Sequence, residues 1–318
     1  MAKWASYQHE GKSYAGVVVG DNVHAAPGRA TLLDLIGAGP VALAQAAEQA
    51  ATSPAHVAAL ADVTLGAPIS NPPALRDCLC FLDHMRNCQL VLAGNRDLND
   101  TWYQRPAFYI GCNSTILGPF DDAPKAPGTM AADFELEIAA VVYGTGPNLT
   151  VEEAQRAIVG YTLFNDWTGR DHQLADQQLG LGQAKGKDCG TTLGPFLVTP
   201  DELEEYFADG RLNLSVTALV NDEVIGSGSL SSADWTLAEM ISFASRGVPL
   251  RAGEVFGSGT VPTCTLVEHL GDTDPTAFRW LQEGDLVTLR VDHLGETRQK
   301  VVGSADPHPL RTLTKPQV

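Results

Sequence analysis

The segment DFELEIAAVVYG, residues 133–144, constrains the fold of this chain more than any other. Its first half alternates acidic and apolar residues, and an extended strand places such neighbours on opposite faces. Asp133, Glu135 and Glu137 would therefore share one face, and the strand continues into the apolar run AAVV. Like charges at the entry to a buried stretch repel one another and lose hydration unless a cation compensates them. The segment predicts either a cation site in a buried strand or, at a sheet edge, a solvated acidic face.

The chain after residue 73 shows further short apolar segments separated by glycine and proline. The 31 glycines and 19 prolines indicate many turns. Segments that read as strands are GYTLFND, LNLSVTALV, EVIGSGS, GEVFGSGTV, DLVTLRVD and RQKVVG. TLAEMISFASRG reads as an amphipathic helix, and Thr150 with Glu153 forms a capping box that starts another helix near Val151. The pattern predicts a mixed α+β fold that is rich in strands.

Residues 1–70 read as a small N-terminal α/β domain. SYAGVVVGDNVHAA predicts a hairpin, and the Ala- and Leu-rich segment 31–61 predicts two helices with a break at GAGP. The run PISNPP at residues 68–73 cannot continue a helix and marks a boundary. We therefore expect a second, catalytic domain at residues 71–318.

The formal net charge of −17 argues against a nucleic-acid or anionic-membrane partner, because phosphate binding needs clustered lysine and arginine. A small anionic substrate would need local positive charge. No stretch approaches the roughly 20 apolar residues of a membrane span. The six cysteines show no regular disulfide framework, and the N-terminus MAKWASYQHEGK lacks a signal-peptide core, so we expect a cytoplasmic protein.

Two further segments bring possible site residues. Asp166 ends the strand-like GYTLFND, and strand ends often carry site residues, although Asn-Asp is also an ordinary turn signal. RDCLCFLDHMRN, residues 76–87, reads as a helix in which Asp77 and His84 lie two turns apart on one face. This predicts a metal ligand next to a general base; the alternative is a histidine with only a packing role.

The glycine-rich stretch GLGQAKGKDCGTTLGP, residues 180–195, invites comparison with a phosphate-binding loop. Its spacing fails that comparison, because too few residues separate Gly182 from Gly186 and Asp188 replaces the serine or threonine. The loop presents Lys185 and Lys187, which suit a carboxylate or an enolate oxygen. The alternative is a loop of solvated lysines.

Five segments in this order resemble the fumarylacetoacetate hydrolase family: RDCLCFLDHMRN, DFELEIAAVV, GYTLFNDWTGRDHQ, GKDCGTTLGP and GEVFGSGTV. The resemblance extends over residues 76–268. It rests on the order and spacing of the segments rather than on any one of them. It implies a fumarylacetoacetate hydrolase-type β-roll as the catalytic domain, preceded by a smaller N-terminal domain, and a homodimer.

The resemblance also implies roles for individual residues. The implied metal ligands are Asp77, Glu135, Glu137 and Asp166, which would hold Mg²⁺, with Ca²⁺ or Mn²⁺ as alternatives. Such an all-oxygen set suits a hard cation. The implied catalytic residues are His84 as general base, Glu268 as its orienting partner, and Lys187. The implied substrate-binding residues are Tyr109, Gln173, Thr260 and Arg170.

The implied activity is divalent-metal-dependent hydrolysis of a C–C bond in a small 1,3-dicarbonyl acid, an acylpyruvate or a fumarylacetoacetate-like compound, in aromatic or amino-acid catabolism. One alternative is a decarboxylase or tautomerase/isomerase of a small 2-oxo acid on the same metal site. The His84 and Glu268 pair favours hydrolysis, because a base that activates water has less to do in a decarboxylase. A non-catalytic metal-binding protein is a third possibility. Residues 92–106 match the family poorly and leave the substrate open.

Overall fold

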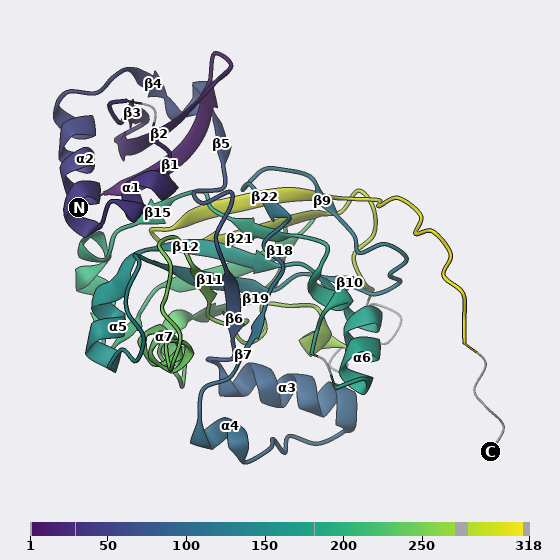
Figure 1. The fold of residues 1–318 in the computed structure, drawn as a ribbon. Coiled ribbons are helices and arrows are strands. Elements are labelled where there is room, and N and C mark those ends of the chain that lie inside the picture. Colours follow the sequence, from purple (N-terminus) through teal and green to yellow (C-terminus); the bar gives the residue numbers. More distant parts are fainter. Residues whose placement is uncertain (1, 29, 181, 271–278, 314–318) are drawn as a thin grey trace.

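The N-terminal part of the chain forms a lobe beside a larger body built mainly of sheet (Figure 1). The computed structural model describes residues 2–28, 30–180, 182–270 and 279–313. Within these residues, a 13-stranded sheet and a 5-stranded sheet dominate, and the helices are short. The chain is therefore a mixed α+β protein rich in sheet, as the sequence predicts.

The N-terminal lobe contains the predicted hairpin and the two predicted helices. Its elements are β1 (Lys3–His9), β2 (Lys12–Val19), β3 (Asn22–Ala25), α1 (Leu32–Gly37), α2 (Pro40–Thr52), β4 (Val57–Ala59) and β5 (Thr64–Gly66). A capping box between Thr31 and Asp34 starts α1, and a proline at the first position starts α2. Both helix starts could be identified from local sequence alone.

The main sheet of the body surrounds β11. Its strands are β6 (Leu75–Cys78), β7 (Phe108–Ile110), β8 (Ile116–Leu117), β11 (Leu136–Val142), β12 (Ile158–Asp166), β14 (Thr191–Leu193), β15 (Leu197–Val198) and β20 (Val255–Gly257). β11 pairs antiparallel with β12 on one side and with β20 on the other, and β20 pairs parallel with β6. All seven residues of β11 are buried, which confirms the predicted buried strand.

The second sheet packs below the N-terminal lobe in Figure 1 and carries the C-terminal strands. Its strands are β9 (Ala123–Pro124), β18 (Ser215–Val220), β19 (Glu223–Ser229), β21 (Leu286–Val291) and β22 (Gly295–Val302). Two short pairs complete the strands: β10 (Ala132–Asp133) with β13 (Thr168–Gly169), and β16 (Phe207–Ala208) with β17 (Arg211–Leu212).

Helices of the body lie on the outside of the sheets (Figure 1). They are α3 (Leu82–Ala93), α4 (Thr101–Gln104), α5 (Val151–Ala157), α6 (Arg170–Gln178) and α7 (Leu237–Ala244). Short 3₁₀ turns are η1 (Leu60–Asp62), η2 (Lys185–Lys187), η3 (Pro200–Glu202), η4 (Glu204–Tyr206), η5 (Leu230–Ser232) and η6 (Val267–His269). The predicted capping box of Thr150 and Glu153 is confirmed, and α5 begins at Val151.

The N-terminal lobe and the body share one sheet and one core. Strand β1 pairs antiparallel with β15, so the main sheet is continuous from lobe to body. Trp4 and Val17 of the lobe lie in the same buried cluster as Val141 and Phe164 of the body. The domain boundary between residues 70 and 71 stays a prediction. Backbone hydrogen bonds and side-chain packing connect the two parts of the chain on either side of it.

The predicted helix over residues 76–87 is wrong in its first half. Residues 75–78 form strand β6, because parallel pairing with β20 and burial of Leu75 and Cys78 outweigh the local helical pattern. Helix α3 begins only at Leu82, whose backbone N–H donates to Asp234 at 2.8 Å. Asp77 and His84 therefore do not share a helix face. They come from a strand and from the helix that follows it.

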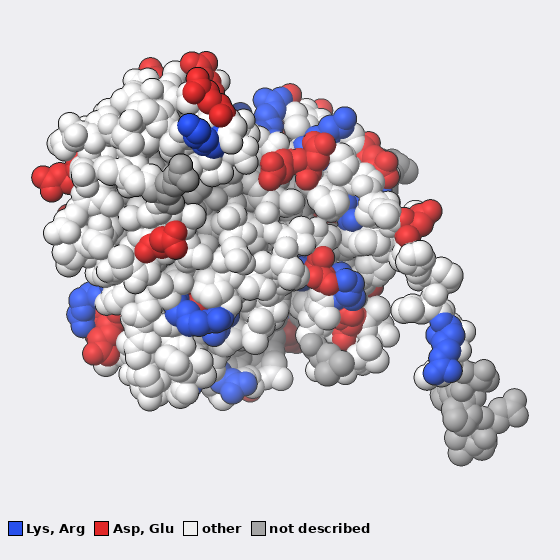
Figure 2. Space-filling model, turned by 45° about the horizontal axis from the view of Figure 1, so that its top comes forward, with Lys and Arg blue, Asp and Glu red and all other residues white. Residues whose placement is uncertain are grey.

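Acidic and basic side chains are scattered over the face shown in Figure 2, and the coloured residues form no broad basic patch there. The absence of a nucleic-acid partner stays a prediction. Among the described residues, no helix is long and apolar enough to cross a membrane.

Candidate active site

Four buried carboxylates meet where neighbouring strands of the main sheet end. Their oxygens all lie within 4.8 Å of one another, and the residues are Asp77, Glu135, Glu137 and Asp166. Asp77 comes from β6, Glu137 from β11 and Asp166 from the end of β12, while Glu135 precedes β11. The backbone N–H of Asp166 donates to the carbonyl of Glu135 at 3.2 Å, which fixes the register at this edge. Strand pairing thus assembles the predicted ligand set from residues far apart in the sequence.

Glycines on the β20 segment make room for the carboxylates. A Cβ atom on Gly257 would lie 2.9 Å from Asp77 Oδ1 and 3.0 Å from Glu137 Oε2, so any side chain there would crowd the cluster. Two residues on, the backbone N–H of Gly259 donates to Glu137 Oε2 at 2.7 Å. Gly259 has φ of +81°, a conformation that favours glycine. The β20 segment therefore both opens and orients the cluster.

The carboxylate cluster fits a divalent cation. Asp77 Oδ1 and Glu137 Oε1 are buried and have no hydrogen-bond partner among the described residues. Burial, followed by the neighbouring carboxylates, raises the pKa of Asp77 and of Glu137 well above the usual values. A bound cation would give these oxygens a partner and compensate their charge. Four carboxylates form the all-oxygen set preferred by Mg²⁺ or Ca²⁺.

Lys187 supplies positive charge beside the cluster. Its ammonium group donates to Thr168 Oγ1 at 2.7 Å, pairs with Asp166 Oδ2 at 2.6 Å and also contacts Glu135. Burial lowers the pKa of Lys187, but the carboxylates of Asp166 and Glu135 outweigh it and raise that pKa, so the lysine stays charged. Lys185 instead is exposed and pairs with Asp188, outside the cluster.

Arg170, at the start of α6, contacts both Glu135 of the cluster and Asp133, an acidic residue outside it. Its guanidinium lies 2.8 Å from Glu135 Oε1, and its Nε donates to Asp133 Oδ2 at 2.8 Å. Asp133, which the sequence placed on one face with Glu135 and Glu137, is not among the four clustered carboxylates, although Arg170 Nη2 lies 2.7 Å from Asp133 Oδ2. Asp133 instead accepts hydrogen bonds from Arg170 and from the backbone of residues 266 and 267.

His84 and Glu268 form a hydrogen-bonded pair between α3 and η6. His84 Nδ1 lies 2.6 Å from Glu268 Oε1, and the other carboxylate oxygen accepts from Asn87 Nδ2 at 2.6 Å and from the Thr263 backbone at 2.9 Å. Glu268 is thus held from three sides. Burial lowers the pKa of His84, but Cys88 and Glu268 outweigh it and raise the pKa well above its usual value. With Nδ1 engaged by Glu268, Nε2 is the ring nitrogen left for proton transfer, and the Cys88 Sγ atom lies 3.7 Å from it.

One cavity of about 340 Å³ brings these groups together. The sequence-predicted residues that line it are Asp77, His84, Tyr109, Glu135, Glu137, Arg170, Gln173, Lys187 and Thr260. The other two, Asp166 and Glu268, contact the lining through Tyr109 and His84. Gln173 accepts from Arg170 Nη1 at 3.1 Å and donates to Gln183. The structure therefore assembles every predicted site residue around one cavity, and their individual roles stay predictions.

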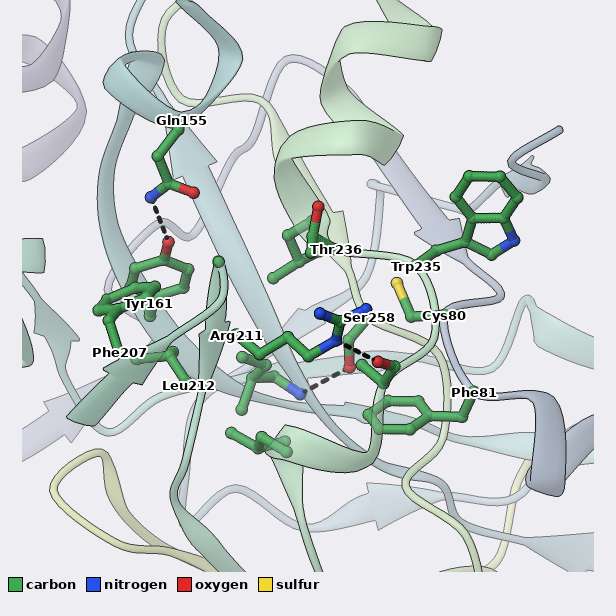
Figure 3. Close-up of a pocket in the computed structure, with 15 residues that line it drawn as sticks. Cys80, Phe81, Gln155, Tyr161, Phe207, Arg211, Leu212, Trp235, Thr236 and Ser258 are labelled. Carbon is green, nitrogen blue, oxygen red and sulfur yellow. Dashed lines mark hydrogen bonds between the residues drawn. The ribbon is translucent and has the colours of Figure 1, made fainter. Parts of the chain in front are cut away.

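A second, smaller cavity is lined by residues that include Cys80, Tyr161, Arg211 and Ser258 (Figure 3). Its volume is about 30 Å³, far below the roughly 300 Å³ at which ligand pockets begin. Arg211 points across it and donates to the Ala233 carbonyl, and Gln155 donates to the Tyr161 hydroxyl at 3.1 Å. Ser258 at its wall directly precedes Gly259 of the active-site cavity. This cavity is therefore too small to be a substrate pocket.

Several residues of the active-site cavity were not identified from the sequence. They are Met85, Cys88, Gln89, Leu174, Gln177, Gln183, Leu270 and Trp280. A helical spacing of four residues links Cys88 to His84 and Gln177 to Gln173, and this spacing was the one available signal. The other contacts depend on how α3 and α6 pack around the cavity.

Gly186 holds the lysine loop against α6, and Gly186→Ala tests this. A Cβ there would lie 2.5 Å from the Cα and 2.6 Å from the N of Gln173, backbone atoms that cannot yield cheaply. The loop would shift and carry Lys187 away from Asp166. We expect turnover to fall by about 100-fold, the effect of a misplacement of about 1 Å. Gly146→Ala, where nothing lies within 4 Å, is the matched control, and equal activity of both variants would contradict this account.

Comparisons with known proteins agree with this fold and site. The model of the family described as fumarylacetoacetate (FAA) hydrolase, C-terminal, matches residues 74–302. A Xenopus laevis protein named mitochondrial oxaloacetate tautomerase is 28% identical over 259 residues, covering 81% of this chain and 74% of its own. A 2,4-didehydro-3-deoxy-L-rhamnonate hydrolase of Sphingomonas sp. is 29% identical over 199 residues, covering 62% of this chain and 65% of its own.

The solved structure of a fumarylacetoacetate hydrolase from Exiguobacterium antarcticum superposes on this chain with a TM-score of 0.70. The two share 25% sequence identity, and the match covers 96% of this chain and all of the other. The superposition confirms the predicted type of fold.

Proposed function

The chain belongs to the fumarylacetoacetate hydrolase family, and we propose that it is a divalent-metal-dependent hydrolase that cleaves a C–C bond in a small 1,3-dicarbonyl acid such as an acylpyruvate. One observation carries this proposal. His84, which Glu268 holds at Nδ1, lines the same cavity as Lys187 and three of the four cluster carboxylates. A base for water and a cation site for the dicarbonyl are the two elements that such a hydrolase needs.

Asp77, Glu135, Glu137 and Asp166 would hold the ion, which we propose to be Mg²⁺. When bound, the ion supplies positive charge that polarises the two carbonyl oxygens and favours the neutral form of His84. Lys187 is already charged and adds to this field from the side of Asp166 and Glu135. The raised pKa that His84 has without the ion therefore does not prevent it from acting as a base.

The protein residues then move protons in two steps. His84 takes a proton from water at Nε2, while Glu268 holds Nδ1 and stabilises the imidazolium. The hydroxide adds to the acyl carbonyl, and the C–C bond to the neighbouring carbon breaks. The electron pair remains on the pyruvate part as an enolate, near the ammonium group of Lys187, and His84 returns the proton to that carbon. One such electrostatic contact is worth about 2.7 to 4 kcal/mol.

A second candidate is a tautomerase or decarboxylase of a small 2-oxo acid. It is favoured by the similarity to the Xenopus laevis oxaloacetate tautomerase. In a tautomerase, His84 would carry a proton between carbon and oxygen, and no water would be consumed. The buried contacts that hold Glu268 on three sides favour the hydrolase, because they stabilise a persistent imidazolium during water attack.

The first test is the loss of ultraviolet absorbance of a panel of acylpyruvates with Mg²⁺ and then with EDTA. For a hydrolase, we expect the absorbance to fall with Mg²⁺ while two products form. With EDTA, the absorbance should change little. If no acylpyruvate is cleaved, release of carbon dioxide from oxaloacetate would favour a decarboxylase, and interconversion of its keto and enol forms without carbon dioxide would favour a tautomerase. Metal binding without any turnover would instead indicate a non-catalytic metal-binding protein.

The quaternary structure and location of the protein are also proposed here. We expect a homodimer in the cytoplasm, as the family resemblance and the cysteine pattern suggest. Light scattering on the purified protein tests the dimer, and a monomer at micromolar concentration would contradict it.

A further inference from the structure

The outer wall of the active-site cavity differs in charge from its inner end. We propose that this wall selects a substrate with a single carboxylate and an uncharged arm, and that Gln177 is a specificity-determining residue. The inference rests on the proposed function, because it concerns the substrate of the same site. It names the substrate class more narrowly: an acylpyruvate with a neutral acyl group, rather than a dicarboxylate.

The positively charged side chains of the cavity lie at its inner end, where they already pair with carboxylates of the protein. Among the described residues, Arg170 and Lys187 are the lysines and arginines that line it. Arg170 pairs with Asp133 and Glu135 and also donates to Gln173 and Thr265. The three protons of the Lys187 ammonium group have three oxygen partners. Both cations therefore serve the metal end, where one substrate carboxylate would bind.

The outer wall is formed by α3, α6 and nearby loop residues and has no charged side chain among the described lining residues. Its polar groups are the amides of Gln89, Gln177 and Gln183, and its apolar groups are Leu174, Leu270 and Trp280. Along α6 the side chains change from the buried Arg170 through the half-buried Gln173 to the exposed Gln177. This order places the amide of Gln177 at the mouth.

A second carboxylate at this wall would lose water without meeting a cation. Amides can replace part of its hydration but none of its charge, so a dianion binds more weakly than a neutral arm of the same length. The net charge of −17 adds a general repulsion. Leu174, Leu270 and Trp280 instead favour an apolar arm, at about fourfold in kcat/KM for each buried methylene group. The wall thus favours monoanions by both charge and contact.

The experiment compares matched acylpyruvates that end in a methyl group or in a carboxylate. For the wild-type holoenzyme with Mg²⁺, we expect kcat/KM to be at least about tenfold higher for the methyl-terminated compound, as for a missing charge partner. Gln177→Arg places a cation at the mouth and should lower this ratio at least about tenfold. Gln178→Arg is the matched control, because it adds the same charge on α6 at an exposed residue outside the cavity lining, and it should leave the ratio within about twofold.

Two results would overturn the inference: a wild-type preference for the dianion, or equal changes of the ratio in the Gln177 and Gln178 variants. A failure of the proposed hydrolase function can be distinguished from a failure of this inference. If neither acylpyruvate is cleaved, the shift in Tm caused by 2-oxohexanoate and by 2-oxoadipate with Mg²⁺ gives the binding preference directly. A larger shift with the monoanion would support the wall's selectivity although hydrolysis had failed, and a larger shift with the dianion would overturn it.

Discussion

Glu137→Gln is expected to abolish metal binding and, at the same time, to raise the stability of the metal-free protein. The amide keeps the shape of the side chain, and its oxygen can still accept from the Gly259 N–H. It removes one charge from four crowded, buried carboxylates. Affinity for Mg²⁺ should fall by more than about 100-fold, since even outer contacts of metal ligands carry about 10- to 100-fold.

The gain in metal-free stability follows from the titration of Glu137. Its pKa is raised by burial and by Asp77, so the wild-type metal-free protein loses stability as the pH rises above the ordinary range of a carboxyl group. Glutamine does not titrate, and that loss should be smaller. The difference in unfolding free energy is on the order of 1.4 kcal/mol for each unit by which the pKa is raised. Thermal unfolding with EDTA at two pH values measures it.

Glu254→Gln is the matched control for Glu137→Gln. Glu254 is also a buried carboxylate, but it pairs with Arg76 at 2.5 Å and lies outside the cluster. Removing its charge leaves Arg76 without its partner, so stability should fall while the Mg²⁺-dependent rise in Tm remains. If both variants change in the same direction, the four carboxylates are not a cation site.

His84→Asn is expected to lower kcat on an acylpyruvate by about 10²- to 10⁴-fold and to leave Mg²⁺ binding unchanged. The reason is that His84 is the base at this cavity and is not one of the four cluster residues. Steady-state kinetics with saturating Mg²⁺ and a parallel Mg²⁺ titration by calorimetry measure the two effects separately.

Glu268→Gln should produce a smaller loss than His84→Asn, because Glu268 positions the imidazole and does not line the cavity. Its loss should fall mainly on kcat and shift the acidic limb of the pH profile downward, since the carboxylate helps to raise the pKa of His84. The control is His172→Asn, because His172 of α6 bonds to the Pro127 carbonyl, and this variant should retain activity.

Turnover of His84→Asn within about tenfold of the wild type would exclude His84 as the proposed base.

The sequence predicted the parts of this fold that depend on local pattern. The hairpin of β2 and β3, the two helices after it and the capping box at Thr150 rest on turn residues and side-chain caps within a few positions. Strand β11 was visible because the apolar run after Glu137 has no polar interruption. The four residues of the predicted metal site were named together by the family resemblance, whereas the local pattern had singled out Glu135, Glu137 and Asp166 in or at the end of strands and had placed Asp77 in a helix.

Long-range pairing decided what the sequence could not predict. Residues 75–78 have a helical pattern, yet they pair with β20, which lies far along the chain. The sequence placed Asp133 beside Glu135 and Glu137, but Asp133 pairs with Arg170 of α6 and lies outside the four-carboxylate cluster. The outer wall of the cavity likewise depends on how α3 and α6 are placed around it, and no local pattern indicated that Gln89 and Gln177 line the same cavity. Such contacts arise from tertiary structure, which outweighs local propensity.

The most direct test of the central claim is mass spectrometry of the products formed from an acylpyruvate in H₂¹⁸O with Mg²⁺. Hydrolysis by the wild-type protein should place one ¹⁸O atom in the carboxylic acid released from the acyl side and yield pyruvate in equal amount, and the His84→Asn variant should form both products slowly. An unchanged substrate mass, with only the keto and enol forms interconverted, or the release of carbon dioxide without labelled acid, would contradict the hydrolase assignment.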